Sequence, residues 1–226
     1  MGAVRSRAPW YVREPANLAA VTGPALVYQP RMRLLEPKGR VVLSGPFEIR
    51  EDDRVLDSFE IEIEPDPESP RAPPIVRETA GRIPWEADRH VFPDTGIACV
   101  VLADGFWFEY PSGLELVDFM KTPLRSYLAA QALVEQGEEW PHGEWGHGLS
   151  GVVEFYGEVL GVSDVAPIID LLRVLASGKP RGGWRCPCGS GRRIRACHHE
   201  VLLQLHDRVP QRLREARWMQ IRGMLR

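Results

Sequence analysis

Three of the four cysteines of this 226-residue chain lie within one stretch of twelve residues, and their spacing restricts how that stretch can fold. Cys186 and Cys188 are one residue apart and can supply two metal ligands from a tight turn, which the glycines at 189 and 191 allow. The adjacent pair Cys197-His198 can close a tetrahedral site. The sequence therefore predicts a small metal-bound knuckle without an open ligand position, which is typical of a structural rather than a catalytic Zn²⁺.

The fourth cysteine, Cys99, stands alone far upstream. It follows the turn signal Asp94-Thr-Gly96 and precedes the apolar run Val100–Leu102. A buried core cysteine is one interpretation, because free cysteine is among the most buried residue types. A nucleophile is the other, because His90 lies nine residues before the thiol. The local sequence leaves both open.

Charge is unevenly distributed along the chain. The formal net charge is −3, yet residues 181–226 hold eleven arginines against three acidic residues, a net charge of +8. Residues 1–180 therefore carry −11. An acidic body with a basic end predicts two different surfaces. The basic end could face nucleic acid, an acidic partner or the acidic body of the same chain.

Nothing in the sequence predicts a membrane span or a secretion signal. The longest apolar run, Ala98–Ala103, is too short to cross a bilayer, and the first residues lack an apolar core. A composition of 44% hydrophobic and 26% charged residues is that of an ordinary soluble protein. We therefore expect a cytoplasmic protein without a membrane partner, where clustered cysteines favour metal over disulfides.

Strand patterns occupy the first half of the chain. Residues 40–50 and 55–64 predict two strands, and the second alternates strictly. The side chains of Phe59, Ile61 and Ile63 would lie on a buried face of this strand. Those of Glu60, Glu62 and Glu64 would lie on the opposite face, which is interpreted as exposed to solvent.

Helical patterns dominate the second half. A proline-rich segment, 65–74, and a short strand around 74–78 come first. Apolar residues then recur at helical spacing in three stretches, 114–133 with a kink or break at Pro123, 152–160 and 166–176. Strands followed by helices predict an α+β domain with an antiparallel sheet.

Glycine and proline replace the helical pattern at residues 177–184, which predicts a linker. The predicted organisation is a main domain over 1–176, this linker, a zinc knuckle over 185–200, and a basic amphipathic helical tail over 201–226.

The knuckle has the pattern C-x-C-G-S-G-x5-C-H. This pattern resembles the SEC-C zinc motif, best known from the C-terminus of the bacterial protein-translocation ATPase. The resemblance covers about fourteen residues, and nearly every position agrees. It implies Cys186, Cys188, Cys197 and His198 as the ligands of one structural Zn²⁺, with His199 as the alternate fourth ligand.

Several short motifs of the main domain follow one another in a definite order. A strand with Ser-Gly-Pro is followed by an alternating strand, by Ser69-Pro-Arg-Ala-Pro-Pro74, by Gly81-Arg-Ile-Pro84, and by His90-Val-Phe-Pro-Asp94 ahead of Cys99. The series resembles the ubiquitin-conjugating enzyme family over roughly residues 35–175. There a strand meander leads to a Y-P-x-x-P-P segment, an H-P-N tripeptide and the catalytic cysteine on a long loop before the second helix. The form R-I-P…H-x-x-x-D-G-x-x-C looks more like the bacterial branch.

The resemblance implies a ubiquitin-conjugating (UBC) fold and a carrier step. Cys99 would accept a ubiquitin-like modifier as a thioester from an activating enzyme and pass it to a lysine of a target protein. His90 would support the oxyanion, and Asp94 would orient the acceptor amine. In bacteria, systems of this kind are associated with antiphage defence.

The chain departs from the family after His90, where Val91 and Phe92 stand and no asparagine follows. Oxyanion support would then come from His90, from backbone N–H groups of the loop, or from a residue elsewhere. The departure favours a rival interpretation, a non-catalytic adaptor with a UBC-like scaffold that binds protein or nucleic acid through its knuckle. The retained Cys99 beside a glycine turn favours the enzyme.

Two weaker patterns in the sequence have simpler explanations. His142, Glu144 and His147 could form a second metal site, but a packed loop explains them better. The tail contains a set that could bind nucleic acid by charge and stacking, Arg214, Arg217, Trp218 and Arg222. A partner-binding or self-packed amphipathic helix over 211–226 explains the same residues and is preferred.

Overall fold

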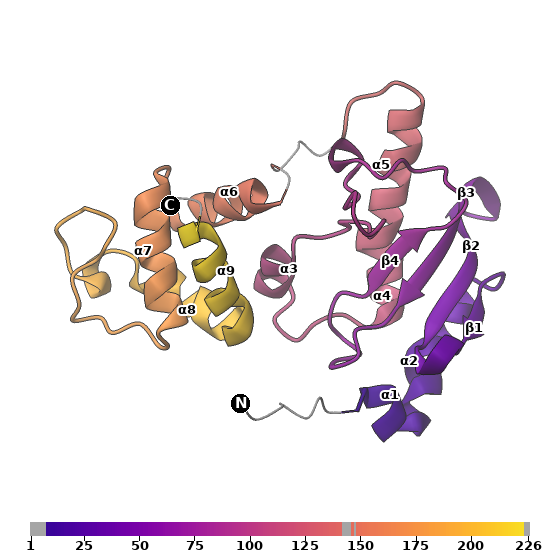
Figure 1. Ribbon diagram of the computed structural model, residues 1–226, viewed down its shortest axis with the longest axis horizontal. Coiled ribbons are helices and arrows are strands. Elements are labelled where there is room, and N and C mark those ends of the chain that lie inside the picture. Colours follow the sequence, from indigo (N-terminus) through magenta and orange to yellow (C-terminus); the bar gives the residue numbers. More distant parts are fainter. Residues whose placement is uncertain (1–7, 142–145, 147, 224–226) are drawn as a thin grey trace. The chain divides into compact units, whose positions relative to one another are not determined.

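The computed structural model describes residues 8–141, 146 and 148–223, and the chain divides into two compact units (Figure 1). Unit 1 comprises residues 1–101 and 113–143, and unit 2 comprises residues 102–112 and 144–226. The predicted linker, 177–184, falls inside unit 2. The segment that contains the three clustered cysteines therefore belongs to a larger helical body.

Unit 1 is built on a four-stranded antiparallel meander. The strands β1 (Arg33–Leu35), β2 (Val42–Glu51), β3 (Arg54–Glu64) and β4 (Ile75–Glu78) pair in the order β1-β2-β3-β4. The predicted α+β class with an antiparallel sheet is confirmed. The predicted alternation in β3 is confirmed as well, because Phe59, Ile61 and Ile63 are buried.

Helices precede and follow the four strands along the chain. The helices α1 (Trp10–Arg13) and α2 (Pro15–Tyr28) precede it, and α4 (Leu116–Phe119) and α5 (Arg125–Glu135) follow it. A π-helical turn, Met120–Leu124, joins α4 to α5 and contains Pro123. Proline lacks the N–H that an α-helical turn requires, so the wider turn is the form that the predicted break takes. The helix α5 packs against β2, with Leu128 fully buried.

Unit 2 is helical. Its elements are α3 (Ala103–Glu109), α6 (Leu149–Leu160), α7 (Val165–Ala176), α8 (His199–Arg208) and α9 (Gln211–Gly223), with a 3-10 turn at Ile194–Ala196. One hydrophobic cluster includes residues of α6, α7, α8 and α9 together with Cys186 and Ile194. The cysteine-rich segment and the two helices before it therefore share a core.

A buried polar network ties three of these helices together. Asp104 of α3 is fully buried and accepts hydrogen bonds from the Tyr156 hydroxyl of α6 (2.8 Å) and the Arg217 Nε of α9 (2.7 Å). Burial raises the pKa of Tyr156 well above its usual value. The phenol therefore stays protonated and remains a donor to the carboxylate.

Candidate functional site

Four side chains of unit 2 bring together the donor atoms of a metal site. One donor atom from each of Cys186, Cys188, Cys197 and His198 lies within 4.8 Å of the other three. The Sγ atoms of Cys188 and Cys197 are 3.5 Å apart, and His198 Nδ1 lies 3.1 Å from Cys197 Sγ. Tetrahedral ligands at ordinary zinc–sulfur and zinc–nitrogen distances lie roughly 3.5–3.8 Å apart. The cluster therefore has nearly the dimensions of a site for one metal ion.

A tight hairpin supplies the first two thiols. The Cys186 N–H donates to the carbonyl of Arg192 at 2.8 Å and closes the hairpin. Gly189 and Gly191 turn the chain with φ angles of +83° and +70°, a region where a side chain is strained. Glycine is therefore favoured at both positions by the backbone geometry.

The next turn supplies the other two donors. Ile194 is fully buried and begins the 3-10 turn, and the Cys197 N–H donates to its carbonyl at 2.9 Å. The helix α8 begins at His199, so His198 occupies the N-cap position. A buried aliphatic anchor thus fixes where Cys197 and His198 meet the hairpin.

The orientation of His198 is set by a second contact. Its Nε2 atom lies 3.0 Å from the carbonyl oxygen of Leu160 at the end of α6. A carbonyl only accepts, so Nε2 carries the proton and neutral His198 presents Nδ1 as a lone pair. His199, the alternate fourth ligand, is not among the four residues of the cluster, and its Nε2 lies beside Gly182.

The thiols differ in acidity in the absence of metal. Burial raises the pKa of the Cys186 thiol to about 12. Burial also raises the pKa of the Cys188 thiol, but hydrogen bonds with Ser190 and with the thiols of Cys186 and Cys197 outweigh burial. The pKa of Cys188 is therefore lowered to about 6. A bound cation favours the thiolate of each ligand and displaces the remaining protons.

Cys99 and His90 lie opposite each other in unit 1. Val91 and Ala98 form an antiparallel bridge, and the Cys99 N–H donates to the His90 carbonyl at 2.7 Å. The Ala98 N–H donates to the Val76 carbonyl of β4, which attaches this hairpin to the sheet. Cys99 itself is half-buried on a loop without regular structure. The fold therefore places the predicted nucleophile and the predicted oxyanion donor at opposite positions of one hairpin.

The helix α5 holds the turn that ends at His90. Fully buried Gln131 donates from Nε2 to the Arg89 carbonyl at 2.6 Å and accepts from Arg89 Nε at 2.8 Å. The Tyr127 hydroxyl donates to the same carbonyl at 3.2 Å. Burial raises the pKa of Tyr127, and the nearby Cys99 thiol contributes in the same direction. The position of His90 is thus fixed from the helix side.

The backbone of His90 adopts a left-handed conformation with φ of +50°. Such a conformation is uncommon for a residue other than glycine and persists only when the surroundings enforce it. The imidazole packs against the indole of Trp140, with ring centroids 4.4 Å apart, and its Nε2 atom is buried. The ring is therefore a fixed part of the site.

Arg82 connects the preceding loop to two other elements. Its guanidinium binds Asp57 of β3 through two bonds of 2.7 Å and Glu135 of α5 through bonds of 2.7 to 3.0 Å. It also lies 3.9 Å from the centroid of the Phe59 ring. These bonds raise the pKa of Arg82 and lower that of Asp57. The R-I-P motif therefore acts as a clamp at the start of the loop that leads to Cys99.

Asp94 lies apart from Cys99 and His90 along the hairpin. Asp94 is exposed in the turn at the closed end of the hairpin, whereas Cys99 and His90 lie at its open end. The loop candidates His142, Glu144 and His147 lie outside the part of the chain that the structure describes.

Three of the four tail residues considered for nucleic-acid binding make contacts within unit 2, and the fourth, Arg222, is exposed. Arg214 is buried and donates to the carbonyls of Leu175 (2.7 Å) and Val209 (3.0 Å). Arg217 pairs with buried Asp104, and Trp218 packs against the core of unit 2. The self-packed form of the predicted amphipathic helix is the one observed. Packing partners distant in sequence could not be predicted from the tail alone.

The support of His90 was only partly predictable from the sequence. The loop that contains Trp140 was expected to pack against the domain and Tyr127 to lie on an apolar helical face, but Gln131, which interrupts that face, was not singled out. A polar residue on such a face is a signal of a buried hydrogen bond, because unpaired buried amides are costly. Its partner, Arg89, lies 42 positions away and became visible only in the fold.

No protein-family profile, curated protein sequence or solved structure matches this chain. Within the described residues, no helix is long and apolar enough to cross a membrane.

Proposed function

We propose that this chain is a thioester carrier for a ubiquitin-like modifier, with Cys99 as the nucleophile. The single observation that carries the proposal is the hairpin that places His90 and Cys99 side by side just beyond β4. The order of elements agrees with the family that the sequence resembles, with a meander, a proline-rich segment before the last strand, and a cysteine on an irregular loop. A cysteine with only a packing role would not require the contacts of Gln131, Tyr127 and Trp140 that hold His90 in place.

The carrier step is an exchange between thiols. The Cys99 thiolate attacks the carbonyl carbon of the modifier's thioester, a new C–S bond forms, and the thiolate of the activating enzyme leaves. The amine of a target lysine then attacks the same carbonyl, forms a C–N bond and loses a proton, and the Cys99 thiolate departs. Both steps pass through an oxyanion that hydrogen-bond donors stabilise.

The surroundings of Cys99 narrow the choice of oxyanion donor. The N–H groups of Cys99 and Ala98 are already bonded to carbonyls, so neither is available. The Tyr127 hydroxyl likewise donates to a carbonyl. We assign the role of oxyanion donor to the imidazole of His90. Asp94 lies at the closed end of the hairpin, and we propose that it contacts a bound protein rather than the reacting atoms.

The metal cluster serves structure in this proposal. Three thiolates and one imidazole match Zn²⁺, and four protein ligands leave no position for a reacting water. Bound zinc would supply a fixed cross-link between the hairpin and the start of α8, and no step of the transfer passes through it.

A charging reaction tests the carrier function. The full-length chain is mixed with ATP, a ubiquitin-like modifier and an activating enzyme from the source genome. We expect an adduct on a non-reducing gel that thiol reductant removes and that Cys99→Ala does not form. If the activating enzyme is demonstrably charged and the wild-type chain forms no adduct, the carrier function is wrong and the adaptor interpretation replaces it.

Two substitutions at His90 separate its ring from its backbone. Glycine adopts the left-handed conformation readily, so His90→Gly relieves backbone strain while it removes the stacking on Trp140. For His90→Gly we expect the free energy of unfolding to differ from that of the wild type by less than about 1 kcal/mol. His90→Ala should be less stable than His90→Gly by about 1 kcal/mol. Transfer to lysine should fall at least roughly 100-fold in both variants. His199→Ala is the control, and full activity of His90→Gly would show that the ring takes no part.

A further inference from the structure

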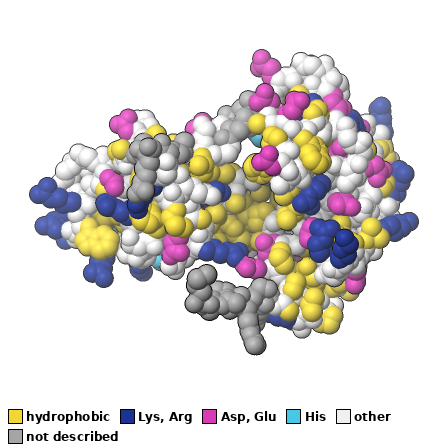
Figure 2. Space-filling model, viewed as in Figure 1, with side chains coloured by type: hydrophobic (Ala, Val, Ile, Leu, Met, Phe, Trp, Pro, Cys, Tyr) yellow, Lys and Arg dark blue, Asp and Glu magenta, His cyan; other side chains and the backbone are white. Residues whose placement is uncertain are grey.

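Most of the exposed positive charge of unit 2 lies on the segment between α7 and α8 rather than on α9. Arg214 is buried and Arg217 is paired with Asp104, so these two arginines of α9 are engaged within unit 2 and are not available to a ligand. The knuckle arginines are exposed instead. Figure 2 shows Lys and Arg side chains gathered at the end of unit 2 formed by the segment between α7 and α8, with hydrophobic atoms among them.

This surface has a definite composition, and we call it the arginine–tryptophan surface. It consists of six exposed side chains, Arg181, Trp184, Arg185, Arg192, Arg193 and Arg195. Residues 177–199 contain one lysine and five arginines and no acidic residue, a net charge of +6. Three thiolates around one Zn²⁺ contribute −1, so the segment keeps +5 when it is loaded.

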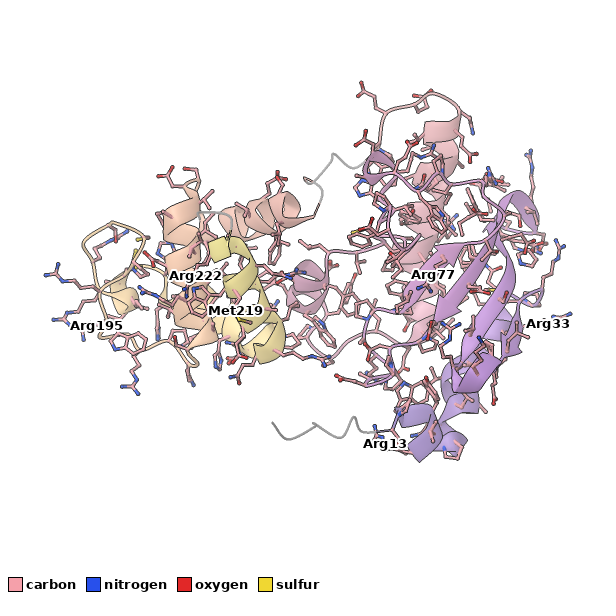
Figure 3. The ribbon with its side chains drawn as sticks, viewed as in Figure 1. Arg13, Arg33, Arg77, Arg195, Met219 and Arg222 are labelled. Atoms are coloured by element: carbon pink, nitrogen blue, oxygen red, sulfur yellow. The ribbon has the colours of Figure 1, made fainter. Side chains whose placement is uncertain are left out.

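The arrangement of these arginines opposes the stability of the hairpin. Arg185 and Arg193 form the isolated antiparallel bridge at its base, and like charges directly opposite each other are destabilising. The Arg193 guanidinium donates to the Gly183 carbonyl at 2.6 Å, and no ion pair with an acidic residue is present at this surface within the described residues. In Figure 3 the side chain of Arg195 points outward from the knuckle. An anionic ligand would remove this repulsion.

An exposed indole lies among these charges. Trp184 is 42% exposed, although tryptophan is usually well buried. The Arg181 guanidinium lies 5.4 Å from the centroid of its ring. The second such pair in unit 2, Arg222 and Trp218, differs because Trp218 packs against the core. Trp184 therefore offers an aromatic face at the surface, with cations on the same segment.

The combination fits one ligand chemistry better than others. Arginine binds phosphate through a planar fork, and an exposed aromatic ring stacks on an unpaired base. An acidic protein segment would match the charge but would leave the indole without a role. A duplex would match the phosphates but keeps its bases stacked on one another. We propose that the arginine–tryptophan surface binds single-stranded nucleic acid, with Trp184 stacked on a base and the arginines on the flanking phosphates.

Fluorescence anisotropy with a labelled twelve-nucleotide oligothymidylate tests the proposal on the zinc-loaded, full-length chain. Each phosphate neutralised on a single strand contributes about −0.7 to the slope of log affinity against log salt concentration. With about four contacts, affinity should fall roughly 50-fold between 50 and 200 mM salt. The double variant Arg192→Ala/Arg195→Ala should reduce the magnitude of the slope by about 1.4.

Substitutions of Trp184 test the stacking. Trp184→Ala should weaken binding roughly 5- to 150-fold and leave the salt slope unchanged, while Trp184→Phe should restore part of the loss. Arg222→Ala is the matched control, because it removes one exposed arginine beside a tryptophan on α9 (Figure 3), and it should change the slope by less than the double variant. Each variant is first checked for one zinc per chain.

Three outcomes would overturn the proposal. One is the absence of binding up to about 100 μM oligonucleotide at 50 mM salt, which is weaker than ordinary non-specific binding. Another is binding that Trp184→Ala and the arginine variant leave unchanged. The third is binding of polyglutamate of equal charge as tightly as the oligonucleotide, with no dependence on Trp184, since that result would identify an acidic protein as the ligand.

Discussion

Removal of the metal should unfold the knuckle and strongly destabilise unit 2. Residues 184–198 contain only one short 3-10 turn and one isolated bridge, so little besides a bound ion fixes their conformation. Cys186 and Ile194 also belong to the hydrophobic cluster of unit 2, and release of the hairpin would expose that cluster. A structural zinc contributes its binding free energy to folding.

We expect a strong chelator to lower the stability of unit 2 by at least about 3 kcal/mol, which for a unit of this size corresponds to about 12–24 °C in Tm. Thermal unfolding followed by circular dichroism measures the shift, and added Zn²⁺ should reverse it. Native mass spectrometry should show one zinc per chain.

A matched pair of variants isolates the cluster. Cys188→Ala and Cys99→Ala each remove one thiol, yet only the first should lose zinc and show the reduced Tm. Equal stability of Cys188→Ala and Cys99→Ala, or a full-length protein that contains no metal after purification, would contradict the assignment of the cluster.

Substitution of Asp104 should have the second largest effect on stability. Asp104→Ala leaves the fully buried Tyr156 hydroxyl without its acceptor and Arg217 without its carboxylate. Breaking a buried pair by removal of one partner costs about 3–5 kcal/mol, and the lower end applies here because the Arg217 side chain is 17% exposed and keeps its hydrogen bond to Gln220. Three helices, α3, α6 and α9, lose their common polar contact at once.

The control for Asp104 is another aspartate of unit 2. Asp170 forms an exposed ion pair with Arg173 on α7, at 3.2 Å, and exposed pairs of this kind contribute less than about 1 kcal/mol. Urea unfolding of the zinc-loaded chain should therefore separate Asp104→Ala from Asp170→Ala by several kcal/mol. If the two variants unfold at the same urea concentration, the buried network does not stabilise unit 2 as described.

Local patterns were predictable from the sequence. The spacing of the clustered cysteines and glycines predicted a turn that gathers four possible metal ligands, and the structure confirms it, because all the donors lie within thirteen residues. The alternation in β3 likewise specified one buried face, because side chains of a strand point to opposite sides in turn. Pro123 marked a break, although the width of the resulting π-helical turn did not follow from the residue alone.

Elements with weak periodicity were missed. The helix α2 has only Thr22 and Ala25 buried, contains Pro24 and lacks a strong apolar face, so no helical pattern stood out. The seven-residue helix α3 begins directly after the apolar run Val100–Leu102. Because that run is continuously apolar, no helical periodicity was recognised there.

The division into two units could not be predicted. Periodicity shows that α6 and α7 each have an apolar face, but it does not identify the element that covers that face. The predicted boundary at 177–184 marked a real break in helical structure between α7 and α8, whereas the shared core of unit 2 extends across it. The link between Asp104 and Arg217 spans 113 positions and follows from packing alone.

The chemical linkage at residue 99 tests the proposed carrier function most directly. Trypsin releases residues 90–121 as one peptide that contains Cys99 and no other cysteine. After charging, we expect the remnant of the modifier on this peptide and its release by thiol reductant. In Cys99→Ser, oxygen replaces sulfur, so any adduct should resist reductant and be released by hydroxide. An adduct on the peptides of Cys186, Cys188 or Cys197, or one that stays sensitive to reductant in Cys99→Ser, would contradict Cys99 as the carrier.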